Sequence, residues 1–235
     1  MRQAVLQERL SELAEPSYRI FQEKLQISSG TLYGIRAPSL QRLAREIAKD
    51  DAFLCFDELL DQDTLSYEET IILYKLFGTI TLSSRQRLEY LPRMLHYNTS
   101  WATNDSLASE MKWIKKDREA FYSYFCTLLN HDEPYAIRLG IVVLMLYYLE
   151  PSTIQEVRKA LSQVQSDHYY VTMALAWAYA TAFCKDREGT LPYLHYGILT
   201  EPVRKKAIQK CRESRLVSEE DKAMLKMLTR APSTH

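Results

Sequence analysis

The chain has 235 residues and balances 30 lysines and arginines against 30 aspartates and glutamates. This length can bury a core without disulfide or metal staples. A neutral total does not predict nucleic-acid binding, although a local basic patch would still attract phosphates. The four cysteines are widely spaced with no CxxC pair, and the five histidines lack metal-ligand spacing. Both observations argue against a metal site or a disulfide framework.

The N-terminal segment carries charges within its first nine residues, so we expect no signal peptide. The longest apolar run, Leu139–Leu149, is too short to span a bilayer and predicts a buried helix. We therefore expect a cytoplasmic protein with reduced thiols and no membrane segment.

Apolar and helix-favouring residues recur at three- and four-residue spacing along almost the whole chain, which predicts an all-α protein. The six glycines form no phosphate loop, and no segment alternates like a strand. The expected helices are Arg2–Ala14, Pro16–Ile27, Pro38–Lys49, Phe53–Leu60, Tyr67–Gly78, Ser84–Leu95, Trp101–Ile114, Asp117–Asn130, Pro134–Leu149, Pro151–Gln165, His168–Phe183, Gly189–Tyr196, Glu201–Glu213 and Ser218–Leu228.

Many helices with short links are typical of a bundle or an α-solenoid. Trp101, Arg138 and Trp177 are spaced by 37 and 39 residues. Armadillo and HEAT repeats recur at about 40–47 residues. The three residues are therefore candidates for equivalent positions in three successive helix pairs.

Trp101 and Asp105 follow Ser100, a favourable helix N-cap, and lie four residues apart. A helix places such a pair side by side, so an indole face and a carboxylate would together suit a cation. The alternative is that Asp105 only stabilises the first turn of its helix.

Arg138 and Trp177 are the next two candidates. Arg138 is the only charged residue from Pro134 through Leu149, so it must either clamp a phosphate or form a structural ion pair, with Asp132 or Glu133 for example. Trp177 shares a helix face with small residues and either projects into a cleft or packs in the core, which is the commoner place for tryptophan.

Basic residues gather in two stretches. Arg204, Lys205, Lys206 and Lys210 follow Val203, and Arg42, Arg45 and Lys49 follow Pro38. Each stretch can contact a phosphate backbone. The commoner explanation is a solvated helix face.

Taken together, these segments resemble the DNA alkylation repair family, and most closely its AlkD-like glycosylases. The likeness runs from about Tyr18 to Leu228. Its marks, in order, are Tyr33–Leu40, Ser100–Asp105, Ile137–Ile141, Ala174–Trp177 and Lys206–Lys210.

The resemblance implies stacked HEAT-like repeats, which we expect to form one domain over residues 1–229, and the terminal position of residues 230–235 predicts a disordered tail. The resemblance also implies a glycosylase that releases cationic N3- and N7-alkylated purines from duplex DNA without flipping the base, and without a metal or cofactor. By motif position, Trp101, Asp105 and Trp177 would be catalytic, and Arg138 would contact the DNA. Arg204, Lys206 and Lys210 are further candidate DNA contacts, and we expect a monomer.

Two alternatives remain open at this point. One is a non-catalytic protein that binds branched or damaged DNA. The other is a helical-repeat scaffold for protein partners, for which a neutral total charge is unremarkable.

Overall fold

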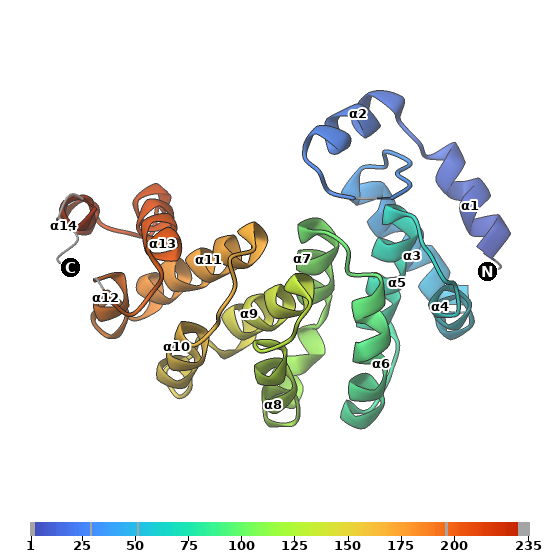
Figure 1. Cartoon of the computed structure of the whole chain (residues 1–235). Coiled ribbons are helices and arrows are strands. Elements are labelled where there is room, and N and C mark those ends of the chain that lie inside the picture. The colour runs from blue at the N-terminus through green and yellow to red at the C-terminus, as the bar shows by residue number, and fades with distance from the viewer. Residues whose placement is uncertain (1–2, 29, 51, 196, 230–235) are drawn as a thin grey trace. The chain divides into compact units, whose positions relative to one another are not determined.

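The computed structural model describes residues 3–28, 30–50, 52–195 and 197–229. Within this part of the chain the secondary structure is helical, without strands, which confirms the all-α prediction (Figure 1). The predicted disordered tail, 230–235, lies outside the described residues. The elements are α1 (Gln3–Glu12), α2 (Pro16–Lys24), α3 (Ala37–Asp50), α4 (Ala52–Leu60), α5 (Tyr67–Thr79), α6 (Ser84–His96), α7 (Trp101–Glu110), the 3₁₀ helix η1 (Lys112–Lys116), α8 (Arg118–Leu128), α9 (Pro134–Tyr148), α10 (Ile154–Ser162), α11 (Tyr169–Lys185), α12 (Arg187–Leu194), α13 (Glu201–Glu213) and α14 (Glu219–Leu228).

The helix starts follow local capping chemistry. Ser66, Ser83 and Ser100 each close a capping box with the third residue of the helix that follows. Such a cap satisfies backbone donors that a helix leaves unpaired, and it stabilises by about 1 kcal/mol. These signals are local, so the sequence predicts the starts of α5, α6 and α7 to within one residue.

Three predicted helices differ from the structure by three residues or more at one end or both. The one expected over Pro16–Ile27 ends at Lys24, because the amides of Leu25 and Gln26 close tight turns onto the carbonyls of Gln22 and Glu23. The one expected over Trp101–Ile114 ends at Glu110, because Met111 leaves helical geometry with ψ 34° and a 3₁₀ turn follows. The one expected from Pro151 begins at Ile154, because the Glu150 carbonyl accepts from the amides of both Thr153 and Ile154 and so closes a turn first.

The chain divides into two compact units, residues 1–121 and 122–235, and each is described by itself. In the first unit α5 packs between α3 and α7, and α4 lies against both α3 and α5 (Figure 1). In the second unit α11 packs between α9 and α13, with α10 bridging α9 and α11 and α12 bridging α11 and α13. In both units every second helix packs against the next in a row, which is the arrangement of a helical-repeat solenoid.

Trp101, Arg138 and Trp177 fall on α7, α9 and α11, so they occupy every second helix as expected. They differ, however, in how far they lie from the start of their helix. Trp101 is the first residue of α7, whereas Arg138 is one turn into α9 and Trp177 two turns into α11. The positions are therefore not equivalent within the repeat.

The interior of the second unit centres on α9 and α11. In α9 twelve of the fifteen residues are buried, Arg138 among them. A Cβ at Gly140 would lie 2.9 Å from the carbonyl oxygen of Phe125, so only glycine lets α9 approach α8 this closely. Gly140 belongs to the Ile137–Ile141 segment, and its role there is helix packing.

The longest apolar run is part of the buried helix α9, and no helix in the described part of the chain is long and apolar enough to cross a membrane. All four cysteines are free thiols, with Cys55 and Cys211 buried and the other two half-buried.

Candidate functional site

The Tyr33–Leu40 segment is held by a buried carboxylate. Glu68 on α5 is completely buried, and its two oxygens accept backbone N–H groups of Tyr33, Gly34 and Ile35 at 2.9 to 3.2 Å. Buried carboxylates are tolerated where several donors point at them. Glu68 thereby fixes the turn that precedes α3.

The same turn holds α2 in place. Gly34 has φ +87°, and a Cβ there would lie within 2.8 Å of the backbone of Arg19, so this position requires glycine. Arg36 pairs with Glu15 at 3.0 Å and stacks over the ring of Tyr18 at 4.6 Å. The first family-like segment therefore acts as a clamp on α2.

The start of α7 is tied to the chain that follows α2. The hydroxyl of Ser100 donates to the carbonyl oxygen of Ile27 at 2.5 Å, and Nε1 of Trp101 donates to that of Leu25 at 3.2 Å. Between these two acceptors lies Gln26, the only described non-glycine residue with positive φ, at 51°. The indole of Trp101 is therefore held in one orientation while its residue stays half-buried.

Asp105 is not the cap of α7. Ser100 accepts from the amide of Thr103, and the first turn contains no acidic residue. Asp105 lies one turn after Trp101, on the same face of the helix and half-buried. The capping alternative for Asp105 therefore loses its geometric basis, and the structure keeps the indole and the carboxylate together.

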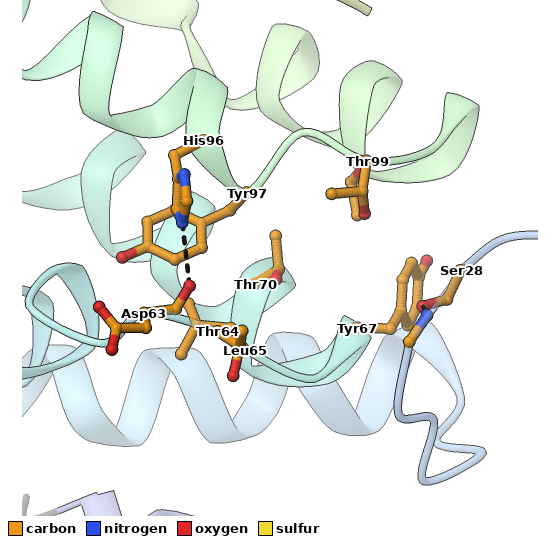
Figure 2. Close-up of a pocket in the computed structure, with 11 residues that line it drawn as sticks. Ser28, Asp63, Thr64, Leu65, Tyr67, Thr70, His96, Tyr97 and Thr99 are labelled. Atoms are coloured by element: carbon orange, nitrogen blue, oxygen red, sulfur yellow. Dashed lines mark hydrogen bonds between the residues drawn. The ribbon is translucent and has the colours of Figure 1, made fainter.

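A cavity of about 290 Å³ lies next to this helix start, in the first unit. Thr99 and Thr103 on either side of Ser100 belong to its lining, and most of the other polar lining groups are hydroxyls (Figure 2). Nε2 of His96 shares a hydrogen bond with the backbone carbonyl of Asp63, not with its carboxylate (Figure 2). Sequence reasoning gave no indication of this cavity, because its lining comes from segments far apart in the chain.

Arg138 is buried in the second unit, with 5% of its surface exposed. Its Nη1 donates to the carbonyl oxygen of Tyr170 at 2.7 Å, which links α9 to the first turn of α11. Tyr135, His168 and Tyr170 form an aromatic cluster beside it, with ring centroids 5.8 to 6.1 Å apart. The sequence analysis did not identify this cluster, whose only local signal is Tyr135 one turn before Arg138.

Trp177 projects from α11, with 37% of its surface exposed, so the alternative of a tryptophan packed in the core does not fit. It lines a cavity of about 390 Å³ between α11 and α13, together with Thr181 and Cys184 from its own face. Lys210 on α13 lines the same cavity. The structure thus brings together Trp177 and one of the candidate DNA-contacting lysines.

Arg204 departs from its predicted place on the surface. It is 1% exposed, and its guanidinium donates to both oxygens of Glu201 at 2.8 and 3.0 Å. Further bonds reach the carbonyls of Leu194 and Leu228, so Arg204 joins α12, α13 and α14. A side chain engaged in this way has no donor face left for a phosphate, and the DNA contact predicted for Arg204 does not fit.

The other basic candidates are accessible. Lys206 and Lys210 are half-buried, and Lys206 donates to Gln209 at 2.9 Å. On α3, Arg42, Arg45 and Lys49 are exposed and form no ion pair with any described residue. Because these three share one face of α3, part of the balanced total charge is segregated into a basic stripe.

Among the described residues, no three His, Cys, Asp or Glu side chains gather into a group that could hold a metal ion.

Comparison with known proteins gives one family. The model of the DNA alkylation repair enzyme family matches residues 6–211. No curated protein matches the chain in sequence. The matched range contains every segment that the resemblance rested on, from the Glu68-bound turn to Lys206–Lys210. The chain therefore belongs to the DNA alkylation repair enzyme family.

Proposed function

We propose that this protein is a DNA glycosylase that hydrolyses the N-glycosidic bond of cationic N3- and N7-alkylated purines in duplex DNA without flipping the base. The observation that carries the proposal is the pair formed by Trp101 and Asp105 at the start of α7. Trp101 is anchored through Nε1, and Asp105 is not used as a helix cap.

The chemistry suits these residue types. An alkylated purine already carries positive charge, so it leaves without a strong general acid. As the C1′–N bond breaks, the deoxyribose takes on oxocarbenium character, and a preorganised carboxylate stabilises that charge and orients the attacking water. The face of an indole adds cation–π stabilisation. Asp105 supplies the carboxylate and Trp101 the indole.

The remaining candidate residues of the proposal lie in the second unit. Trp177 offers a second, partly exposed indole, and Lys210 lies beside it on the same cavity. We propose that Trp177 is required for activity, that Arg138 supports DNA contact through its position between α9 and α11, and that Lys206 and Lys210 meet the phosphate backbone.

The test is release of alkylated base from methylated duplex DNA, measured by chromatography. We expect Asp105→Asn to lower the release rate by at least about 100-fold, the order of magnitude for removing one charge-stabilising group. Its melting temperature should stay within a few degrees of wild type, because Ser100 remains as the cap. Asp50→Asn, at an exposed carboxylate at the end of α3, is the matched control and should leave the rate unchanged.

No release by folded wild type would overturn the proposal. If that wild type nevertheless bound branched or damaged duplexes in a salt-dependent way, the non-catalytic DNA-binding alternative would replace it.

A further inference from the structure

A second cavity of the first unit lies away from the Trp101–Asp105 pair. It has a volume of about 500 Å³, and its lining combines the α5–α6 turn with η1 and the residues around it. It therefore lies where α7 has ended, whereas Trp101 is at the start of that helix. A helix of this length rises about 15 Å, which separates the cavity from the Trp101 end.

Most of the charged groups that line this cavity, which we call the η1 cavity, are cations. Arg87, Lys112 and Lys116 contribute positive charges, and the single lining carboxylate belongs to Asp117. That carboxylate accepts the hydroxyl of Ser84 at 2.5 Å. Among the described residues, no carboxylate pairs with Lys112 or Lys116, and both lysines are exposed. Their charge is available to a ligand.

Arg87 is the unusual member of the set. It is 6% exposed, and its guanidinium donates to the carbonyls of Phe77 and Ile80, both at 2.8 Å. It also stacks on Trp113 at 4.4 Å, but within the described chain it has no carboxylate partner. Burial lowers the pKa of Arg87 to about 10, so it stays protonated at neutral pH.

A buried cation without a counter-ion is costly unless an anion approaches it. Two unpaired lysines at the mouth of the same cavity strengthen the positive field, and lysine binds phosphate as a point charge. Phosphate groups carry more charge and more acceptor oxygens than carboxylates, so they complement this lining better.

We propose that the η1 cavity binds a phosphate group, with Lys112 and Lys116 as its direct partners and Arg87 as the fixed charge behind them. The phosphate can belong to a small molecule or to a nucleic-acid backbone. The proposal does not depend on the glycosylase activity.

Inorganic phosphate is the probe for the first experiment. The full chain is labelled with ¹⁵N at the tryptophan indoles, and the signal of Trp113 is assigned with Trp113→Phe. At constant ionic strength set with chloride, phosphate should shift the Trp113 signal saturably. Lys112→Gln combined with Lys116→Gln should weaken this binding by about tenfold or more, because the loss of one hydrogen bond to a charged group already weakens binding by roughly that factor.

Lys115→Gln is the matched control. Lys115 is an exposed lysine of the same 3₁₀ helix but does not line the cavity, so this variant should bind phosphate like wild type. If the control weakened phosphate binding as much as the double variant, the effect would come from the general surface charge, and the proposed site would be overturned.

The second experiment separates the two sources of phosphate. Duplex DNA binding is measured between low and moderate salt for the same variants. The quantity compared is the slope of log affinity against log salt concentration. If the double variant lowers this slope by about 2 and Lys115→Gln does not, the cavity holds backbone phosphates. A phosphate-dependent Trp113 shift with unchanged DNA binding assigns it to a small molecule. Absence of both effects overturns the proposal.

Discussion

At the scale of single residues, environment decides which of several similar side chains are available for function. Arg138, Arg204 and Lys210 all looked like phosphate contacts in the sequence. In the structure Arg204 is almost completely buried against Glu201, Arg138 bridges two helices, and Lys210 lines a cavity beside Trp177. Residue type alone does not predict these three outcomes, because each depends on which groups the fold brings next to the side chain.

The Glu201–Arg204 pair leads to a pH prediction. Hydrogen bonds from Arg204 hold the pKa of Glu201 down at about 2, below its ordinary value of 4.5. A lowered folded-state pKa contributes stability above the unfolded value, and that contribution is lost as the pH falls from about 4.5 to 2. In the Glu201→Gln variant the melting temperature should therefore fall less than in wild type as the pH is lowered through this window.

The control for this window is Glu89→Gln, at an exposed carboxylate whose one ion pair within the described residues is with Arg85. It should leave the pH profile as in wild type, since exposed pairs contribute little. If both variants gave the wild-type profile, Arg204 would not depend on Glu201 as its acidic partner.

At the scale of elements, the Tyr33–Leu40 segment and α5 form one unit through Glu68. The carboxylate holds three amides, and the turn in which they lie clamps α2 through Gly34 and Arg36. The chain after α2 in turn accepts hydrogen bonds from Ser100 and Trp101. The proposed catalytic indole is therefore positioned by a chain of contacts that begins at a buried acid.

Glu68→Gln tests this dependence. One oxygen remains to accept from Gly34 and Ile35, but the new amide group faces the N–H of Tyr33, which loses its acceptor. Leaving a buried donor unpaired costs about 1–3 kcal/mol, which chemical denaturation would measure. A loss below 0.5 kcal/mol, roughly the effect of a surface substitution, would contradict the role given to Glu68.

At the scale of the whole molecule, a balanced total charge coexists with local basic surfaces. Arg42, Arg45 and Lys49 form one on α3, the η1 cavity is another, and Lys206 and Lys210 provide a third on α13. Binding to a polyanion depends on such local charge because screening limits the reach of distant charges to about 10 Å. The neutral total is therefore compatible with a DNA substrate.

Lys206→Gln combined with Lys210→Gln should weaken binding to undamaged and methylated duplexes alike. The slope of log affinity against log salt should fall by about 2, because two phosphate contacts are lost. Lys159→Gln, at an exposed lysine on α10, should leave the slope unchanged. A slope that responds equally to both changes would remove the α13 lysines from the proposed interface.

The sequence by itself determined the all-α class, the positions of nearly all helices and the family. It did so because capping serines, prolines and apolar spacing act over a few residues, and the family-like segments are short and contiguous. It also placed Trp101 beside Asp105, since that pairing needs only one helical turn. Only the tertiary structure decided that Trp177 projects into a cavity and that Arg204 is buried. Each of these outcomes depends on contacts between different helices, and a pattern of neighbouring residues does not predict such contacts.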